Sequence, residues 1–193
     1  MPFTSLATAS AENWRQIMGH ERRTPYGHHV SSLLMLLLRQ QKNDECFGVP
    51  INGYQHCLQT ATRVLNAGEP PELIVCSLFH DVPEKMAPFA HGAVIADILK
   101  PFIGERNEWM LRHHPVFQQY HFLEHPGIDR HAREAFRGSP HFAYAADYCE
   151  TYDQNSFDPD FPTLPLERFE PIVEAYFSQF NTLESLNLPC PPD

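Results

Sequence analysis

The spacing of apolar residues is helical over most of this chain, and it constrains the fold more than any other feature. Between His28 and Gln41, leucine and valine recur three and four residues apart, which places them on one face of a helix. Similar spacing returns in the later segments, whereas the alternation of apolar and polar residues typical of strands is weak. The sequence therefore predicts an all-α fold, a single helical bundle.

Glycine and proline mark the ends of several predicted helices. Gly68 is a plausible C-terminal stop, and Pro70 and Pro71 open the next helix, because proline is tolerated in a first turn. Pro83 ends that helix, and Pro115 predicts a kink inside a later one. The predicted helices span residues 28–41, 53–67, 70–81, 92–99, 105–119, 130–136, 140–153 and 166–180.

Composition limits the classes of protein and partner. A chain of 193 residues is long enough for one domain, here 1–193, with a Pro-rich tail at 187–193 that we expect to be loose. The formal charge of -10 argues against nucleic-acid binding, which needs a basic face. The five cysteines form no CxxC pair, a usage typical of a reducing compartment. We find no signal peptide and no apolar run long enough for a membrane span, so we expect a cytoplasmic protein without a membrane partner.

Four histidines and two aspartates form a candidate ligand set for a pair of metal ions. Each lies on or beside its own predicted helix, so a bundle can bring them to one point: His56, His80, Asp81, His91, His114 and Asp153. Imidazole suits iron, zinc, manganese or nickel, and a carboxylate between two such sites can bridge them. A single histidine is more often a surface or core residue, and the adjacent pairs His28-His29 and His113-His114 leave open which member matters. Two long loops, 42–52 and 153–165, are candidate lids or walls of the site.

The pattern H…HD…H…H…D resembles the HD-domain superfamily, and within it the mixed-valent diiron oxygenases, such as 2-amino-1-hydroxyethylphosphonate oxygenase and myo-inositol oxygenase. The similarity covers about 48–153, the expected metal-binding core. It implies two iron ions, with manganese or another divalent metal as alternatives, around a catalytic centre that includes His80 and Asp81. One iron is expected to bind His56, His80, Asp81 and Asp153, and the other His91 and His114, with Asp81 as the bridge.

The family's basic substrate-binding positions are not basic in this chain. Glu84 stands where HD phosphohydrolases usually have lysine, and Gln118 and Glu150 replace basic residues of the phosphonate oxygenase. Carboxylates beside a phosphate repel it. A neutral polyol or an amino alcohol therefore fits Glu84 and Glu150 better than a hydroxyphosphonate, provided that these side chains face the pocket. Gln59, Asn52, Arg63 and Lys85 are further candidates for orienting ligands or contacting the substrate.

The sequence is compatible with three functions. The first is an oxygenase that uses O2 to oxidise or oxidatively cleave a small hydroxylated substrate. The second is a metal-dependent phosphohydrolase acting on a nucleotide or phosphoester, for which Glu84 is a weakness. The third is a binding module that retains an idle metal site. The sequence favours the oxygenase, with a small molecule and O2 as partners, and leaves the oligomeric state open.

Overall fold

The computed structural model describes residues 3–46, 48–182 and 184–186, and this part of the chain is helical without any strand. The all-α prediction is confirmed. Within the described residues the α-helices are α1 (Ala11–Arg23), α2 (Tyr26–Gln40), α3 (Gly53–Asn66), α4 (Pro71–Phe79), α5 (His91–Leu99), α6 (Glu105–Gln118), α7 (Phe142–Tyr148) and α8 (Glu170–Phe177). None of them is both long and apolar enough to cross a lipid bilayer.

Short 3-10 and π segments complete the described elements. The 3-10 segments are η1 (Leu6–Thr8), η2 (Gln119–His121), η3 (Ala132–Phe136), η5 (Leu166–Arg168), η6 (Ser178–Phe180) and η7 (Glu184–Leu186). A π-helical segment, η4 (Cys149–Asp153), continues directly from α7. The predicted helices at 130–136, 140–153 and 166–180 thus contain non-α turns that the apolar spacing did not reveal. The Pro-rich tail at 187–193 lies outside the described residues.

Local sequence signals explain where the central helices begin and end. Asn52 caps α3 with its side chain, which accepts a hydrogen bond from the Gln55 N–H, while the Gln55 side chain accepts one from the Asn52 N–H. After α3 ends, Gly68 adopts a φ of 75°, a left-handed conformation that favours glycine, as predicted for a C-terminal stop. Pro71 is the first residue of α4, as expected from its lack of a backbone N–H.

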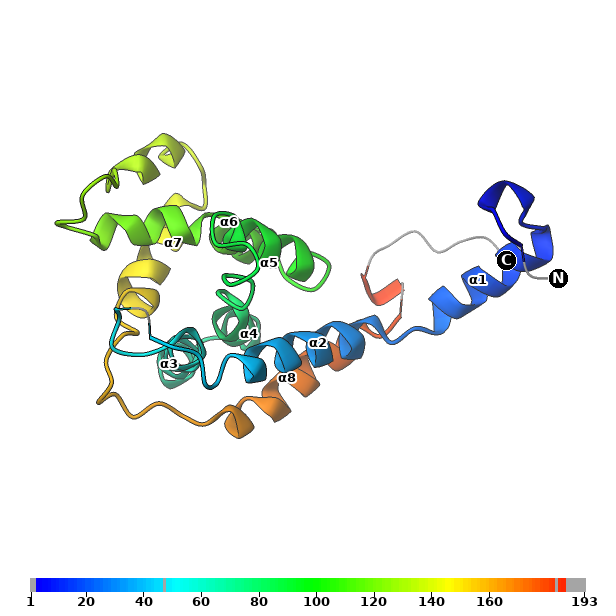
Figure 1. Ribbon diagram of the computed structural model, residues 1–193, viewed down its shortest axis with the longest axis horizontal. Helices are drawn as coiled ribbons and strands as arrows, with labels where there is room; N and C mark the ends of the chain where they lie inside the picture. The colour runs from blue at the N-terminus through cyan, green and yellow to red at the C-terminus, as the bar shows by residue number, and fades with distance from the viewer. Residues whose placement is uncertain (1–2, 47, 183, 187–193) are drawn as a thin grey trace.

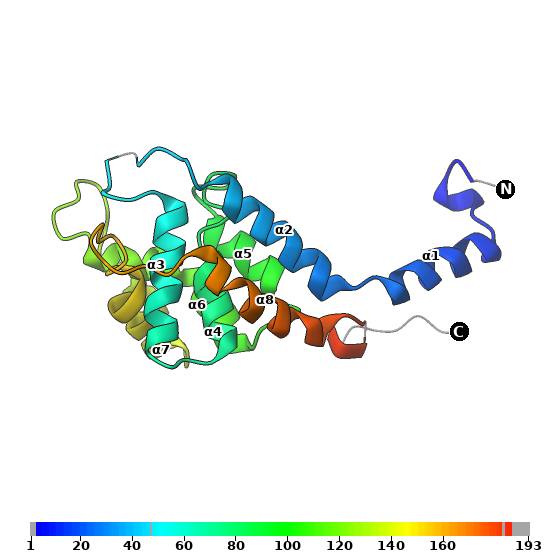
Figure 2. The ribbon, with the colours of Figure 1, turned by 90° about the horizontal axis from the view of Figure 1, so that it is seen from below.

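The helices pack in pairs around one apolar core. Figure 1 and Figure 2 both show α5 beside α6 and α2 beside α8, and α3 packs closely against α4. Burial of aliphatic and aromatic side chains from these helices is the main stabilising contribution. Fully buried core residues include Leu38, Ala61, Val64, Val75, Leu78, Ile95, Leu99, Met110, Leu111, Phe117 and Phe177.

Helix α1 was not predicted, and it extends away from the bundle (Figure 2). It begins with a capping box in which Ser10 and Asn13 exchange side-chain to backbone hydrogen bonds. Its Trp14 side chain remains 41% exposed. The helix therefore depends on local capping more than on core packing, and its sequence carries no buried apolar stripe that would have predicted it.

Candidate metal centre

The six predicted ligands come together in the structure. His56 lies on α3, His80 and Asp81 follow α4, His91 begins α5, His114 lies on α6, and Asp153 ends η4. Their nitrogen and oxygen atoms form overlapping groups, each compact enough to hold a metal ion. Five separate elements thus contribute to one buried cluster, which can bind metal.

One part of the cluster contains His56, His80 and Asp153. The two Nε2 atoms are 3.0 Å apart, and Asp153 Oδ1 lies 3.1 Å from His56 Nε2 and 3.6 Å from His80 Nε2. Two donor atoms that are each about 2.1 Å from one ion and about 90° apart are about 3.0 Å from each other. The spacing therefore fits ligands arranged around a common cation.

Asp81 connects this part of the cluster to a second pair of histidines. Its Oδ2 atom lies 3.4 Å from His56 Nε2 and 3.3 Å from His80 Nε2. Its Oδ1 atom lies 3.0 Å from His114 Nε2 and 3.3 Å from His91 Nε2. The two oxygens of one carboxylate thus face two different pairs of imidazoles.

Backbone carbonyls orient the four imidazoles. The Nδ1 atoms of His56, His80 and His114 lie 2.8, 2.8 and 2.7 Å from the carbonyl oxygens of Ser156, Ser77 and Leu111. A more distant contact of 3.4 Å joins His91 Nδ1 to the Pro88 carbonyl. A carbonyl can only accept, so each Nδ1 must carry the proton. In a neutral ring this leaves the Nε2 lone pair pointing at the cluster, which is the arrangement that metal-binding histidines adopt.

The buried carboxylates of the cluster are stabilised by nearby positive charge. Burial lowers the pKa of His56, but its hydrogen bonds with Asp153 and Asp81 outweigh burial and raise that pKa to about 10. Burial raises the pKa of Asp81, but the surrounding imidazoles, His80 foremost, hold it well below its usual value. Without metal, protons must separate the facing nitrogen atoms and balance the carboxylates. A metal cation can replace those protons, so the donor set fits a metal ion.

Close contact between α5 and α6 brings His91 to His114, with ring centroids 5.1 Å apart. The residue after His91 is Gly92, where a Cβ atom would lie 2.8 Å from the Leu111 carbonyl oxygen and 2.9 Å from Pro115 Cδ. Only glycine allows the two backbones to approach this closely. The packing of these helices therefore depends on Gly92.

The loop that follows Asp153 is attached to α3 and forms a wall of the site. Gln59 on α3 donates to the Asp158 carbonyl at 2.7 Å and accepts from the Asp158 N–H at 3.1 Å. Arg63 donates to the Asn155 carbonyl, and the Phe157 ring stacks on His56 with centroids 4.4 Å apart. Of the candidate orienting residues, Gln59 and Arg63 thus act through this loop. The other two lie elsewhere: Asn52 caps α3, and Lys85 pairs with Asp44.

The three predicted substrate residues lie at different places. Glu84 is exposed just beyond Asp81, and partial burial together with the Asp81 charge raises its pKa. Gln118 is inside the cluster, where its side-chain amide donates to Asp153 Oδ1 at 2.9 Å. Glu150 is exposed, and its charge acts on His121 instead. Gln118 therefore orients a predicted ligand, and Glu84 is close enough to Asp81 for the Asp81 charge to act on it.

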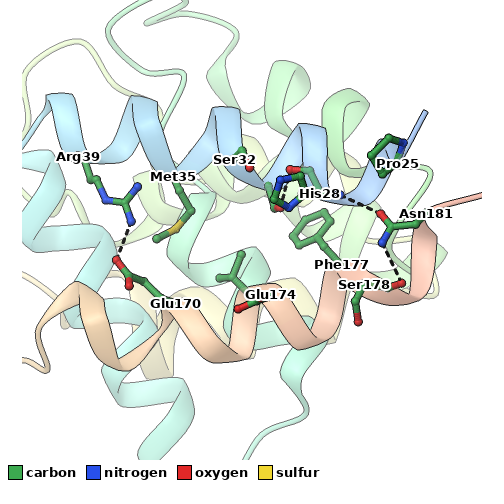
Figure 3. A pocket seen from close by; sticks show the side chains of 12 residues that line it. Pro25, His28, Ser32, Met35, Arg39, Glu170, Glu174, Phe177, Ser178 and Asn181 are labelled. Carbon is green, nitrogen blue, oxygen red and sulfur yellow. Dashed lines mark hydrogen bonds and ion pairs between the residues drawn. The ribbon is translucent and has the colours of Figure 1, made fainter. Parts of the chain in front are cut away.

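The histidines left open by the sequence lie outside the cluster. His113 stacks on Trp109, with its Nδ1 donating to the Trp109 carbonyl at 2.8 Å. His29 is exposed on α2, and His28 lines a surface groove of about 560 Å³ between α2 and α8. Figure 3 shows this groove, with the Arg39–Glu170 ion pair of 2.6 Å at one end. None of the six predicted ligands lines it.

Sequence reasoning missed residues that support the cluster through their backbone. Ser77, Leu111 and Ser156 contribute carbonyl oxygens, which any residue type would provide. Cys149 was also missed, although its buried Sγ atom lies 3.9 Å from Asp153 Oδ2. The position of Cys149 beside Asp153 depends on the π segment, which the sequence did not predict.

No protein-family model matches this chain, and no curated protein is significantly similar to it in sequence.

Proposed function

We propose that this protein is a non-haem diiron oxygenase that uses O2 to oxidise or oxidatively cleave a small hydroxylated substrate. The observation that supports the proposal most is the position of Asp81. Its two oxygens face two imidazole pairs, as expected of a carboxylate that bridges two metal ions. The resemblance to the diiron oxygenases of the HD-domain superfamily supplies the choice of metal and reaction.

The two proposed metal positions differ in their number of protein ligands. His56, His80, Asp153 and Asp81 surround the first, whereas His91, His114 and Asp81 surround the second. The side chains of Asp81 and His91 are each 12% exposed, while those of His80, His114 and Asp153 are fully buried. The second position therefore has fewer protein donors than the first. It also includes His91, which solvent can reach, as a substrate site requires.

Two iron ions supply the Lewis acidity and the redox capacity that reaction with O2 requires. The protein residues hold and orient this centre. Backbone carbonyls fix the imidazole rings, and Gln118 fixes Asp153 through a hydrogen bond of 2.9 Å. Phe157 covers His56 and reduces the access of water to the first position.

Phosphate-ester hydrolysis is the main competitor, since a bridged pair of metal ions also serves that reaction. Glu84 makes this reaction less favourable, because its exposed carboxylate lies near Asp81. A negative charge there would repel a phosphate group, whereas a cation at the same place would attract it. A binding module with an idle metal site would show neither reaction.

The test begins with protein purified without oxygen, loaded with iron and partly oxidised. Electron paramagnetic resonance is expected to show a mixed-valent Fe(II)/Fe(III) signal that candidate polyols or amino alcohols perturb. Oxygen uptake should then match product formation and stop under argon. Release of phosphate from nucleotides or phosphoesters at the same rate with and without O2 would instead establish the hydrolase. Iron-replete protein without the signal and without oxygen uptake would refute the oxygenase.

A further inference from the structure

Just beyond the end of α6, three side chains form a cluster of buried nitrogen atoms that lack hydrogen-bond partners. They are His121 in η2, Arg130 in the following loop and Arg133 in η3, which we call the η2–η3 cluster. Seven buried side-chain nitrogen or oxygen atoms lack a hydrogen-bond partner among the described residues. Four of the seven belong to these three residues: His121 Nε2, Arg130 Nε, and Arg133 Nε and Nη1. Unsatisfied buried donors are rare, and their concentration at one place requires an explanation.

Arg133 is the central member, because its side chain is only 10% exposed. Its guanidinium lies on the ring of Tyr120, 3.4 Å from the centroid, and Arg130 lies 4.7 Å from the same centroid. Stacking on an aromatic ring stabilises each cation but satisfies none of the N–H groups at its edge. Two guanidinium groups beside one ring also repel each other.

Nearby acidic residues do not satisfy the cluster. Glu134 Oε1 lies 3.8 Å from Arg133 Nε, beyond hydrogen-bonding distance, and Glu134 Oε2 already accepts two bonds from Arg137. Glu150 acts on His121 through its charge, but its side chain makes no hydrogen bond with the cluster in the described structure. The acceptors that these donors need are therefore missing from the described part of the chain.

The η2–η3 cluster adjoins the metal centre. His121 comes three residues after Gln118, whose amide donates to Asp153 Oδ1. The charge of Asp153 acts on His121, and the charge of Arg133 acts on Cys149, whose Sγ is 3.9 Å from Asp153 Oδ2. A molecule held by the cluster is thus close to the ligands of the proposed iron site.

We propose that His121, Arg130 and Arg133 form a subsite that binds an oxyanion, namely a phosphate, sulfate or carboxylate group of the substrate. Arginine edges pair with such groups through parallel N–H bonds, and an oxyanion on the Nη1/Nη2 edge of Arg133 would satisfy its buried Nη1 atom. The assignment to the substrate rests on the proposed function; the binding of an anion does not. The subsite also changes the expected substrate from a neutral or cationic molecule to one that carries an anionic group. The positive charge that is absent at residues 84, 118 and 150 is present at residues 130 and 133.

The test measures anion binding to metal-free protein, so that coordination to iron cannot contribute. Inorganic phosphate, sulfate and acetate are titrated separately by calorimetry at low ionic strength. Wild-type protein is expected to bind at least one of them, and Arg133→Gln to bind it at least about tenfold more weakly. Arg106→Gln is the matched control, because Arg106 also stacks on a tyrosine, Tyr144, at 4.1 Å and has no unpartnered buried nitrogen. It should bind within twofold of wild type.

Since Arg133 is buried, Arg133→Gln is checked by circular dichroism, and Arg130→Gln provides a second, less buried variant with the same expected loss. If wild-type protein binds phosphate more tightly than acetate, the subsite is assigned to a tetrahedral anion. If it binds acetate more tightly, the subsite is assigned to a carboxylate. Absence of binding by wild-type protein, or equal binding by both variants and wild type, would refute the subsite. Anion binding without oxygen uptake would refute only the oxygenase, and oxygen uptake with a neutral substrate but no anion binding would refute only the subsite.

Discussion

The Nδ1 atom of His114 donates a hydrogen bond to the carbonyl oxygen of Leu111, at 2.7 Å, within the same helix. In a regular α-helix that carbonyl would accept the N–H of the residue four positions later. Here this residue is Pro115, which has no N–H. The proline therefore leaves an acceptor free for the imidazole and helps to aim His114 Nε2 at Asp81.

Substitution of Pro115 by alanine should weaken metal binding. The new N–H would compete with His114 for the Leu111 carbonyl, and loss of such a supporting bond typically costs about 10- to 100-fold in affinity. Metal titration followed by calorimetry measures the change. Pro171→Ala is the control, because Pro171 lies in the first turn of α8, where an N–H has no intrahelical acceptor. Equal affinities of the two variants would contradict the role of Pro115.

Asp81→Asn should reduce the metal content by at least half. The substitution keeps the size of the side chain but removes the charge shared by both imidazole pairs. Elemental analysis of protein loaded with excess metal and then desalted gives the metal-to-protein ratio. Asp97→Asn changes an exposed aspartate that pairs with Arg112, and it should retain the wild-type ratio. A full complement of metal in Asp81→Asn would rule out the bridge.

Metal binding should strengthen as the pH rises. In the metal-free protein the pKa of His56 is about 10, so a proton must leave before the metal binds. Apparent affinity should rise by up to about tenfold per pH unit for each proton released, between neutral pH and about pH 10.

The stability of the metal-free protein should follow the opposite trend. Because the folded pKa of His56 lies above the unfolded value of 6.5, its contribution is complete below about pH 6.5 and is lost as the pH rises through about 10. Thermal unfolding in chelator at pH 6.5 and pH 9.5 checks this, with the lower melting temperature expected at pH 9.5. A flat profile would contradict the pairing of His56 with Asp153 and Asp81.

Gly92→Ala should destabilise the fold and displace His91. The added Cβ atom would meet the backbone of α6 at 2.8 to 3.0 Å, and forced separation of packed helices costs about 1–3 kcal/mol. Chemical denaturation measures the loss in free energy of unfolding, and metal titration measures the effect on the site. Gly138→Ala is the control, since a Cβ atom added there would have no neighbouring atom within 4 Å. Comparable losses in both variants would refute the packing argument.

Gln59→Ala should loosen the loop that follows Asp153. The buried Gln59 amide makes two bonds with the Asp158 backbone, and their loss is expected to cost about 1–2 kcal/mol. Amide hydrogen exchange in residues 154–163 should accelerate, whereas exchange in α5 and α6 should not. Gln16→Ala, an exposed change on α1, controls for the substitution itself. Unchanged exchange in the loop would show that other contacts hold it.

The sequence predicted the parts of this structure that depend on residue type. Histidine and aspartate are recognisable ligands, so His56, His80, Asp81, His91, His114 and Asp153 could be grouped before their positions were known. Gly68 and Pro71 marked helix ends for similar reasons. The supporting carbonyls of Ser77 and Ser156 have no such signature, because every residue has a carbonyl. The stacking of Arg130 and Arg133 around Tyr120 was missed because it depends on tertiary placement of a short, irregular segment.

The π-helical segment makes the position of Asp153 depend on chain length. The N–H of Gln154 donates to the Cys149 carbonyl, five residues earlier, so this turn contains one residue more than an α-turn. A regular α-helix through the same residues would instead carry Asp153 roughly 100° further around the helix axis and move the carboxylate out of the cluster. The extra residue of this turn is therefore what brings the carboxylate to the imidazoles, and a chain can carry all six ligand residues without assembling the centre.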